Sequence, residues 1–310
     1  MTEPSEIIGE AQAARLLPER DRRGHKGTFG RVVMVAGSLD YAGAALMAGT
    51  AALRTGGGLV TLCLPSSLQP ALAGRVPELI TRGLPEVSPG ELDAVPAAAS
   101  IVELEHDALL VGPGLRPGRG TSRLVGRLLA EDGAPAVVDA GALNALATVP
   151  GWWSRIVRRC VLTPHPGEFR RLGIEPGSDD GQRRRAALEA ATAWGQVVVL
   201  KGAASVVAEP GGRVLVAPFE LPGLATAGSG DVLAGIVTSL LGQGVEPFDA
   251  AALGVYLHGR AGEQLSERLG DAGLLATDLL LEIPRARRQL ALLRGRDSGG
   301  QLGFVAPRQP

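Results

Sequence analysis

The chain has 310 residues, 31 basic and 32 acidic side chains, a net charge of -1 and two cysteines. This length can build a substantial core, and the balanced charge argues against nucleic acid or an acidic membrane surface as a partner. The cysteines lie in separate apolar runs without a CxxC pair, so we expect buried thiols rather than a disulfide or a zinc site. The start of the chain has no signal-peptide pattern and the uncharged run 232–245 is too short for a bilayer, so we expect a soluble, cytoplasmic protein.

Short apolar runs rich in Val and Leu alternate with longer amphipathic segments along the chain. The runs predict buried strands at 31–36, 59–64, 108–111, 136–138, 160–163 and 197–200. The longer segments predict helices at 43–55, 121–131, 182–194, 232–241 and 248–269. Strands that are apolar on both faces are typical of a largely parallel sheet with helices on both sides. The sequence therefore predicts an α/β fold with one central sheet.

Two segments depart from this alternation. Residues 206–216 contain two apolar runs around Glu-Pro-Gly-Gly, which predicts a β-hairpin that adds antiparallel strands at the sheet edge. Residues 297–310 are polar with Gly and Pro, which predicts a flexible tail. Since no repeat or linker divides the chain, we expect one domain over 1–310, with an N-terminal extension at 1–24 and a core at 25–285.

Polar and glycine-rich residues follow four of the predicted strands. They are Gly112-Pro-Gly114, Asp139, the loop Thr163-Pro-His-Pro-Gly-Glu168 and the loop Lys201-Gly-Ala-Ala-Ser205. In an open parallel sheet, ligands bind in the crevice beyond the carboxyl ends of the strands. We therefore expect these four segments to converge on one binding site.

The run Leu224-Ala-Thr-Ala-Gly-Ser-Gly-Asp231 directly precedes a predicted helix. Its glycines allow successive backbone N–H groups to point at one oxyanion, next to the carboxylate of Asp231. Such a pair suits phosphoryl transfer to a hydroxyl, with Asp231 as the base. The alternative is that Asp231 only caps the helix, because Asp is a favoured N-cap residue.

The other polar residues also have two interpretations. Lys201 can hold a phosphoryl donor or can be a solvated strand end. Glu168 can help to place Mg²⁺, directly or through water, or can favour the first turn of its own helix. His165 can bind a polar ligand or be structural. The small residues Gly43 and Ala44 can form the floor of a ligand site or serve helix packing alone.

The ordered motifs closely resemble those of the ADP/ATP-dependent NAD(P)H-hydrate dehydratases, over about 24–281. The motifs are His25-Lys-Gly-Thr-Phe-Gly30, Gly112-Pro-Gly114, Leu162-Thr-Pro-His-Pro-Gly-Glu-Phe169, Leu200-Lys-Gly-Ala203, Gly223 to Gly235, and Gly254-Val-Tyr-Leu-His-Gly-Arg-Ala-Gly262. The resemblance implies a ribokinase-like three-layer αβα sandwich. It also implies a lyase that repairs NADH and NADPH hydrated on the nicotinamide ring (NADHX and NADPHX), by phosphorylating the ring hydroxyl from ADP or ATP and then eliminating phosphate.

The resemblance implies roles for individual residues of this chain. The hydrate would contact Ala44, Gly114, His165 and Asp231, with Asp231 as the catalytic base. The adenine nucleotide would contact Lys201, Gly202, Ala203, Ala204, Ser205 and Gly230. The amides of Gly228, Ser229 and Gly230 would form the anion hole, Glu168 would contribute to the Mg²⁺ site, and a homotetramer is implied. Two departures from the family pattern, Gly141 and Leu221, each remove a polar side chain near the crevice.

Two other functions stay open at the level of sequence. One is a small-molecule kinase of the same superfamily, such as a hydroxyethylthiazole or sugar kinase, although such kinases usually have Asn in place of His165. The other is a nucleotide-binding regulator without activity, because a fold alone never excludes one. The presence of Asp231, Lys201 and Glu168 together argues against a pure binder.

Overall fold

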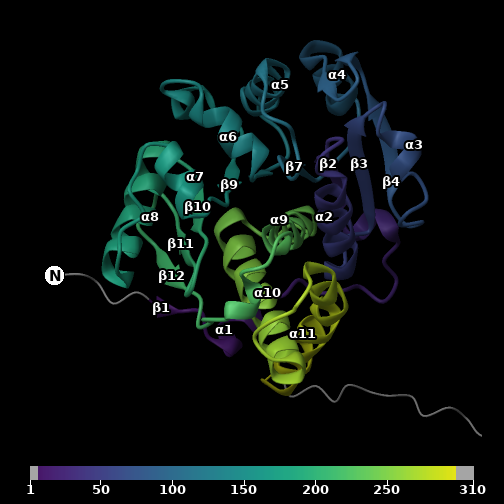
Figure 1. The fold of residues 1–310 in the computed structure, drawn as a ribbon. Coiled ribbons are helices and arrows are strands. Elements are labelled where there is room, and N and C mark those ends of the chain that lie inside the picture. Colours follow the sequence, from purple (N-terminus) through teal and green to yellow (C-terminus); the bar gives the residue numbers. More distant parts are fainter. Residues whose placement is uncertain (1–5, 298–310) are drawn as a thin grey trace, which may run out of the picture.

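A ten-stranded sheet forms the centre of the protein (Figure 1). The computed structural model describes residues 6–297, and the side chains of residues 6–294. The strands follow the order β1-β12-β11-β10-β9-β8-β7-β2-β3-β4. Their bounds are β1 Glu6–Ile7, β2 Arg31–Val35, β3 Leu59–Pro65, β4 Ile80–Leu84, β7 Ala108–Val111, β8 Ala136–Val138, β9 Cys160–Leu162, β10 Val197–Leu200, β11 Val206–Ala208 and β12 Val214–Val216. A separate pair is formed by β5 (Glu86–Ser88) and β6 (Glu91–Leu92).

The sheet is parallel except where β11 pairs with β10 and with β12. This antiparallel hairpin confirms the prediction for residues 206–216, but it does not occupy the sheet edge. Strand β1 pairs in parallel with β12 and lies outside it. A strand of two residues leaves no periodic pattern in a sequence, so only the tertiary structure reveals it.

Helices cover both faces of the sheet, as Figure 1 shows. One face carries α1 (Glu10–Leu16), α2 (Ala42–Thr55), α9 (Ser229–Gly242), α10 (Pro247–Leu269) and α11 (Ala276–Asp297). The other carries α4 (Ala94–Val102), α5 (Arg119–Leu129), α6 (Gly141–Ala147), α7 (Pro166–Arg171) and α8 (Asp180–Trp194). Shorter elements are α3 (Gln69–Leu72) and the 3₁₀ turns η1 (Lys26–Phe29), η2 (Trp152–Arg155) and η3 (Pro222–Leu224). The three-layer α/β fold is therefore confirmed.

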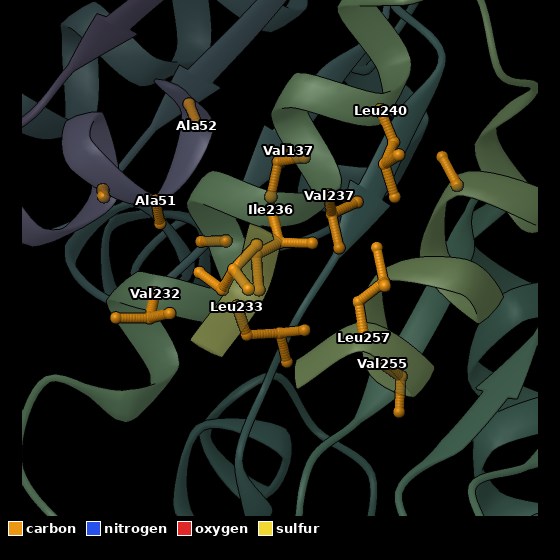
Figure 2. Close-up of a cluster of buried hydrophobic side chains, with 14 of the residues drawn as sticks. Ala51, Ala52, Val137, Val232, Leu233, Ile236, Val237, Leu240, Val255 and Leu257 are labelled. Carbon is orange, nitrogen blue, oxygen red and sulfur yellow. The ribbon is translucent and has the colours of Figure 1, made fainter. Parts of the chain in front are cut away.

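Alternate strand residues build two cores, one on each face of the sheet. In β2, Val32 and Met34 belong to the core under α2 and α9, whereas Val33 and Val35 belong to the core under α4 and α5. Helix α9 is apolar almost all round and is packed between α2, α10 and the sheet (Figure 2). A helix without a polar face is stable only when it is buried in this way.

Both ends of the described chain lie in regular elements, β1 and α11. Ile8 is fully buried and α1 packs on α10 and α11, so residues 6–16 join the main core. Residue 297 ends α11, and the rest of the predicted tail, 298–310, lies outside the described residues. Both cysteines are buried and free, as predicted. Within the described residues, no helix combines the length and the apolar character that a membrane span requires.

Candidate active site

Three neighbouring strands deliver the polar side chains of the site. Asp139 follows β8, the loop 163–168 follows β9, and Lys201 follows β10. The N–H of Lys201 donates to the Pro164 carbonyl at 2.9 Å, and the N–H of Thr163 donates to Val138 at 3.1 Å. Because these strands are parallel, their carboxyl ends open at one edge of the sheet. The predicted convergence of these segments is present.

Lys201 is held by two carboxylates and is not a solvated strand end. Its Nζ donates to Asp139 Oδ1 at 2.7 Å and lies 3.8 Å from Glu168 Oε2. The Lys201 side chain is 17% exposed, and Asp139 is 1% exposed. The Thr163 hydroxyl also donates to Asp139 Oδ1, at 2.8 Å. Burial alone would lower the pKa of Lys201, but Asp139, Glu168 and Asp231 together hold it above its ordinary value.

Asp231 lies in the first turn of α9 and does not cap it. The helix begins at Ser229, three residues earlier than predicted, and its N-cap residue is Gly228, which has no side chain to cap with. Gly228 has a φ of 90°, a conformation that suits glycine. The cap interpretation of Asp231 is therefore wrong.

The surroundings of Asp231 raise its pKa. Burial and, after it, the charges of Asp139 and Glu168 raise the pKa of Asp231 to about 7, against the opposing charge of Lys201. A carboxyl group with this pKa exchanges its proton close to neutral pH, where a general base is most effective. Three carboxylates therefore face one ammonium group at this site.

The first turn of α9 presents open backbone donors. Among the described residues, the N–H groups of Gly230 and Asp231 have no hydrogen-bond acceptor. The N–H of Ser229 donates instead to the Thr226 carbonyl at 3.3 Å. A Cβ on Gly230 would lie 3.3 Å from Lys201 Nζ, so the ammonium group and the open amides are adjacent. This combination can bind an oxyanion, although the amide of Ser229 contributes less than predicted.

His165 and Glu168 hold each other at the start of α7. The Nδ1 of His165 accepts from the N–H groups of Gly167 at 3.0 Å and Glu168 at 3.4 Å, while Glu168 Oε2 accepts from the His165 N–H at 2.9 Å. This is a reciprocal capping box, so the structural interpretation holds for both residues. The His165 side chain is nevertheless 50% exposed, and its Nε2 lies 3.6 Å from Glu168 Oε1. Burial, followed by the charge of Lys201, lowers the pKa of His165 and favours the neutral ring.

Ala44 and Gly114 meet at the neighbouring end of the crevice. Gly114 has a φ of 67°, and a Cβ there would lie 3.0 Å from the Ala44 Cβ and 2.5 Å from the Tyr41 carbonyl oxygen. A larger residue at position 114 would push away the start of α2. The two predicted substrate residues are therefore in contact with each other.

The predicted nucleotide loop is a tight turn after Lys201. Gly202 has a φ of 148° and Ala204 a φ of 47°, while the Ser205 hydroxyl donates to the Gly202 carbonyl at 2.9 Å. Gly202 and Ala203 are exposed. The turn thus offers small, accessible residues beside the ammonium group of Lys201.

Asp139 and Thr163 belong to the segments predicted to converge on the site, but only the structure gives them a role, which is to hold Lys201. Asp139 directly follows a buried strand, and this was the available signal; its pairing with Lys201 was not readable. The departure at Gly141 also has a structural reason, because a Cβ there would lie 2.4 Å from the Leu115 carbonyl oxygen. The loop 112–115 closes onto the space that a side chain at this position would need.

The side chains of the site can hold a divalent cation only together with the phosphates of a bound substrate. Among the described residues, no group of three or more His, Cys, Asp or Glu side chains is close enough to hold a metal by itself. Asp139, Glu168 and Asp231 nevertheless share the single ammonium group of Lys201, and this excess of carboxylates favours a cation. Mg²⁺ commonly binds through one or two carboxylates plus substrate phosphates.

Comparison with known proteins agrees with this geometry. The family model described as NAD(P)H-hydrate dehydratase matches residues 32–285. The chain belongs to the NAD(P)H-hydrate dehydratase family. It is 37% identical to the ADP-dependent (S)-NAD(P)H-hydrate dehydratase of Xanthomonas campestris, covering 92% of this chain and 97% of that protein. It is 46% identical to a bifunctional NAD(P)H-hydrate repair enzyme of Moorella thermoacetica, covering 92% of this chain and 54% of that protein.

Solved structures support the same family and the ribokinase-like fold. The ADP/ATP-dependent NAD(P)H-hydrate dehydratase of Bacillus subtilis, co-crystallised with ATP and Mg²⁺, superimposes with a TM-score of 0.81. It is 31% identical, covering 93% of this chain and all of that one. A hydroxyethylthiazole kinase of Pyrococcus horikoshii has a TM-score of 0.58 at 18% identity, which shows a shared fold alone. The chain spans about half the length of the bifunctional dehydratase relatives.

Proposed function

We propose that the protein is an ADP- or ATP-dependent dehydratase that converts (S)-NADHX and (S)-NADPHX to NADH and NADPH. The observation that carries the proposal is the position of Asp231, a carboxyl group with a pKa of about 7, in the same helix turn as the open N–H of Gly230. A site that only binds nucleotide has little use for such a base. Membership of the family supports the same reaction.

In the first step, the hydroxyl of the hydrated ring attacks the terminal phosphorus of the nucleotide. Asp231 accepts the hydroxyl proton as the new oxygen–phosphorus bond forms, and the bond to the bridging oxygen of the nucleotide breaks. The ammonium group of Lys201 and the N–H groups of Gly230 and Asp231 would bind the negative charge on the transferred group. Asp139 and Thr163 keep that ammonium group in place.

In the second step, phosphate leaves. The ring carbon–oxygen bond breaks with its electron pair on the phosphate, and loss of a proton from the neighbouring carbon restores the ring double bond. Hydroxide is a poor leaving group and phosphate a good one, so the phosphorylation makes the dehydration possible. The contact between Ala44 and Gly114 would form the wall against which the nicotinamide ring lies.

The cosubstrate would bind along the turn Lys201 to Ser205, with Gly230 near its terminal phosphates. Mg²⁺, when bound, would neutralise phosphate charge and orient the phosphates, with Glu168 as the protein contribution, directly or through water. The capping box fixes the Glu168 carboxylate for this role. Cytoplasmic location and a homotetramer remain predictions, and light scattering of the purified protein tests the assembly.

The direct test is an incubation of the protein with NADH hydrate, Mg²⁺ and either ADP or ATP. We expect recovery of NADH absorbance together with stoichiometric release of inorganic phosphate. Accumulation of a stable phosphorylated product without NADH would identify a kinase instead. Binding of nucleotide without any turnover of the hydrate would identify a non-catalytic binder.

Replacing the base separates catalysis from binding. We expect Asp231→Asn to bind ADP with an affinity close to that of the wild type and to lose about 10³-fold in kcat, as for the removal of a general base. Single-turnover absorbance and calorimetric titration with ADP measure the two quantities. Normal turnover of this variant would reject Asp231 as the base.

A further inference from the structure

His258 is a buried side chain in contact with the active-site turn. It belongs to α10, which packs against α9, and it is 9% exposed. Its Nε2 lies 3.0 Å from the carbonyl oxygen and 3.1 Å from the hydroxyl oxygen of Ser229. Ser229 is the first residue of α9, so a single ring nitrogen contacts two atoms at the start of that helix.

The contact defines the state of the ring. Burial lowers the pKa of His258 to about 4, so the imidazole is neutral at physiological pH. A carbonyl oxygen can only accept a hydrogen bond, and Nε2 must therefore carry the hydrogen of the neutral ring. His258 thus donates to the Ser229 carbonyl, and the nearby hydroxyl shares the same donor.

The Ser229 carbonyl belongs to the same peptide unit as the N–H of Gly230. A peptide unit is planar and trans, so its C=O and N–H groups point in opposite directions and rotate together. A donor that holds the carbonyl from one side therefore fixes the direction of the N–H on the other side. The N–H of Gly230 has no acceptor among the described residues and lies next to Lys201.

Among the described residues, His258 is the side chain that donates to this carbonyl, which also accepts the intrahelical N–H of Leu233 one turn further along α9. The N-cap residue is Gly228, which makes no side-chain cap bond. Gly228 and Gly230, on either side of Ser229, also carry no side chain that could restrain this peptide. Hydrogen bonding to the carbonyl further polarises the peptide unit, which makes its N–H a stronger donor.

We propose that His258 is a positioning residue that orients the Ser229–Gly230 peptide so that the Gly230 N–H points at the transferred phosphoryl group. The inference rests on the proposed phosphoryl transfer for its role in turnover. The hydrogen bond itself does not depend on that proposal.

A matched pair of variants tests the inference. In His258→Gln the side-chain amide nitrogen occupies the place of Nε2, whereas in His258→Asn it occupies the place of Nδ1 and does not reach Ser229. We expect His258→Asn to lose about 10- to 100-fold in kcat with little change in the KM for ADP, by analogy with the loss of an oxyanion donor. We expect His258→Gln to restore most of that loss.

A merely structural role gives a different pattern. It would lower the melting temperature of both variants and leave the kcat of the folded fraction unchanged. Equal kcat values for the two variants, whether high or low, would overturn the inference.

A second measurement is independent of turnover. The backbone ¹H–¹⁵N resonance of Gly230 reports the polarisation of its peptide unit. We expect an upfield amide proton shift in His258→Asn and almost none in His258→Gln, and identical spectra would overturn the inference. If the wild type does not recover NADH, the proposed function fails, and the resonance of Gly230 still decides whether His258 orients this peptide.

Discussion

At the scale of residues, the ion pair between Asp139 and Lys201 controls the charge of the site. Asp139 and Lys201 are 62 residues apart in sequence and form a buried ion pair at 2.7 Å. Asp139 stabilises the ammonium group and at the same time raises the pKa of Asp231. A single carboxylate thereby acts on both the cation and the base.

The acidity of Asp231 predicts the pH dependence of turnover. As a base it works only when ionised, so kcat/KM should rise with pH through a midpoint near 7.

The free energy of unfolding should fall with pH over the same range. The native state holds this proton more tightly than the unfolded chain, whose pKa is near 3.8, so the contribution to stability is lost as pH rises from about 4 to about 7.

The variant Asp231→Asn checks the stability half of this prediction. This variant has no buried charge at position 231. We therefore expect its free energy of unfolding at pH 8 to exceed that of the wild type by on the order of 1 kcal/mol, and its melting temperature to be higher, with smaller differences near pH 5. Scanning calorimetry across this range measures it. A constant difference at all pH values would contradict the raised pKa.

Removing the charge of Asp139 should shift the same profile. In Asp139→Asn the negative charge that raises the pKa of Asp231 is gone, and Lys201 loses its main partner. We expect the midpoint of kcat/KM against pH to move to lower pH, and kcat to fall at least about tenfold because the ammonium group is no longer held. The exposed Asp271→Asn serves as the control and should leave the profile unchanged.

At the scale of elements, the packing of α9 on α2 aligns the two helices that begin at the site. The helices approach closely because Gly235 has no side chain, and a Cβ there would lie 2.2 Å from the Ala48 carbonyl oxygen. Ala51, which faces the same contact, is labelled in Figure 2. The small residues of α2 therefore serve packing, whereas Ala44 at its first turn faces Gly114.

A pair of glycine substitutions tests this packing. Gly235→Ala should destabilise the protein by about 2 kcal/mol, since an extra methyl group meets backbone that cannot move easily. Gly126→Ala is the matched control, because Gly126 is an exposed residue within α5 with open space around it. It should stabilise the protein by about 0.5–1 kcal/mol through helix propensity. Urea denaturation compares the two, and equal effects would contradict the close helix contact.

At the scale of the whole molecule, the N-terminal segment is part of the folded body. Strand β1 extends the sheet, with the N–H of Ile8 donating to the Val216 carbonyl at 2.9 Å. The division into an extension at 1–24 and a core at 25–285 remains a prediction about the chain. The packing of α1 against α10 and α11 nevertheless ties the two parts together.

Two neighbouring isoleucines test this contribution. Ile8 is fully buried and Ile7 is 64% exposed. Ile8→Ala should lower the free energy of unfolding by about 3 kcal/mol, while Ile7→Ala should change it by less than about 0.5 kcal/mol. Chemical denaturation measures both, and a negligible effect of Ile8→Ala would mean that the segment is only loosely attached.

The sequence by itself predicted eight of the ten strands of the central sheet, the helices α2, α5, α8, α9 and α10, and the loops that carry the site. Buried parallel strands are continuous apolar runs, and the residues directly after them must lie at one edge of the sheet. For this reason Lys201, Glu168 and His165 were identifiable without coordinates, and the glycine-rich turn before α9 marked Asp231. The order of the motifs also indicated the family, which the comparisons confirmed.

Only the tertiary structure decided how these residues act on one another. The pairing of Lys201 with Asp139, the place of β1 beside β12, and the contact of His258 with Ser229 all join segments that are distant in sequence. Local patterns report which residues are buried, but not which distant residue faces them across the core. The structure also places the start of α9 at Ser229, which removes the interpretation of Asp231 as a cap.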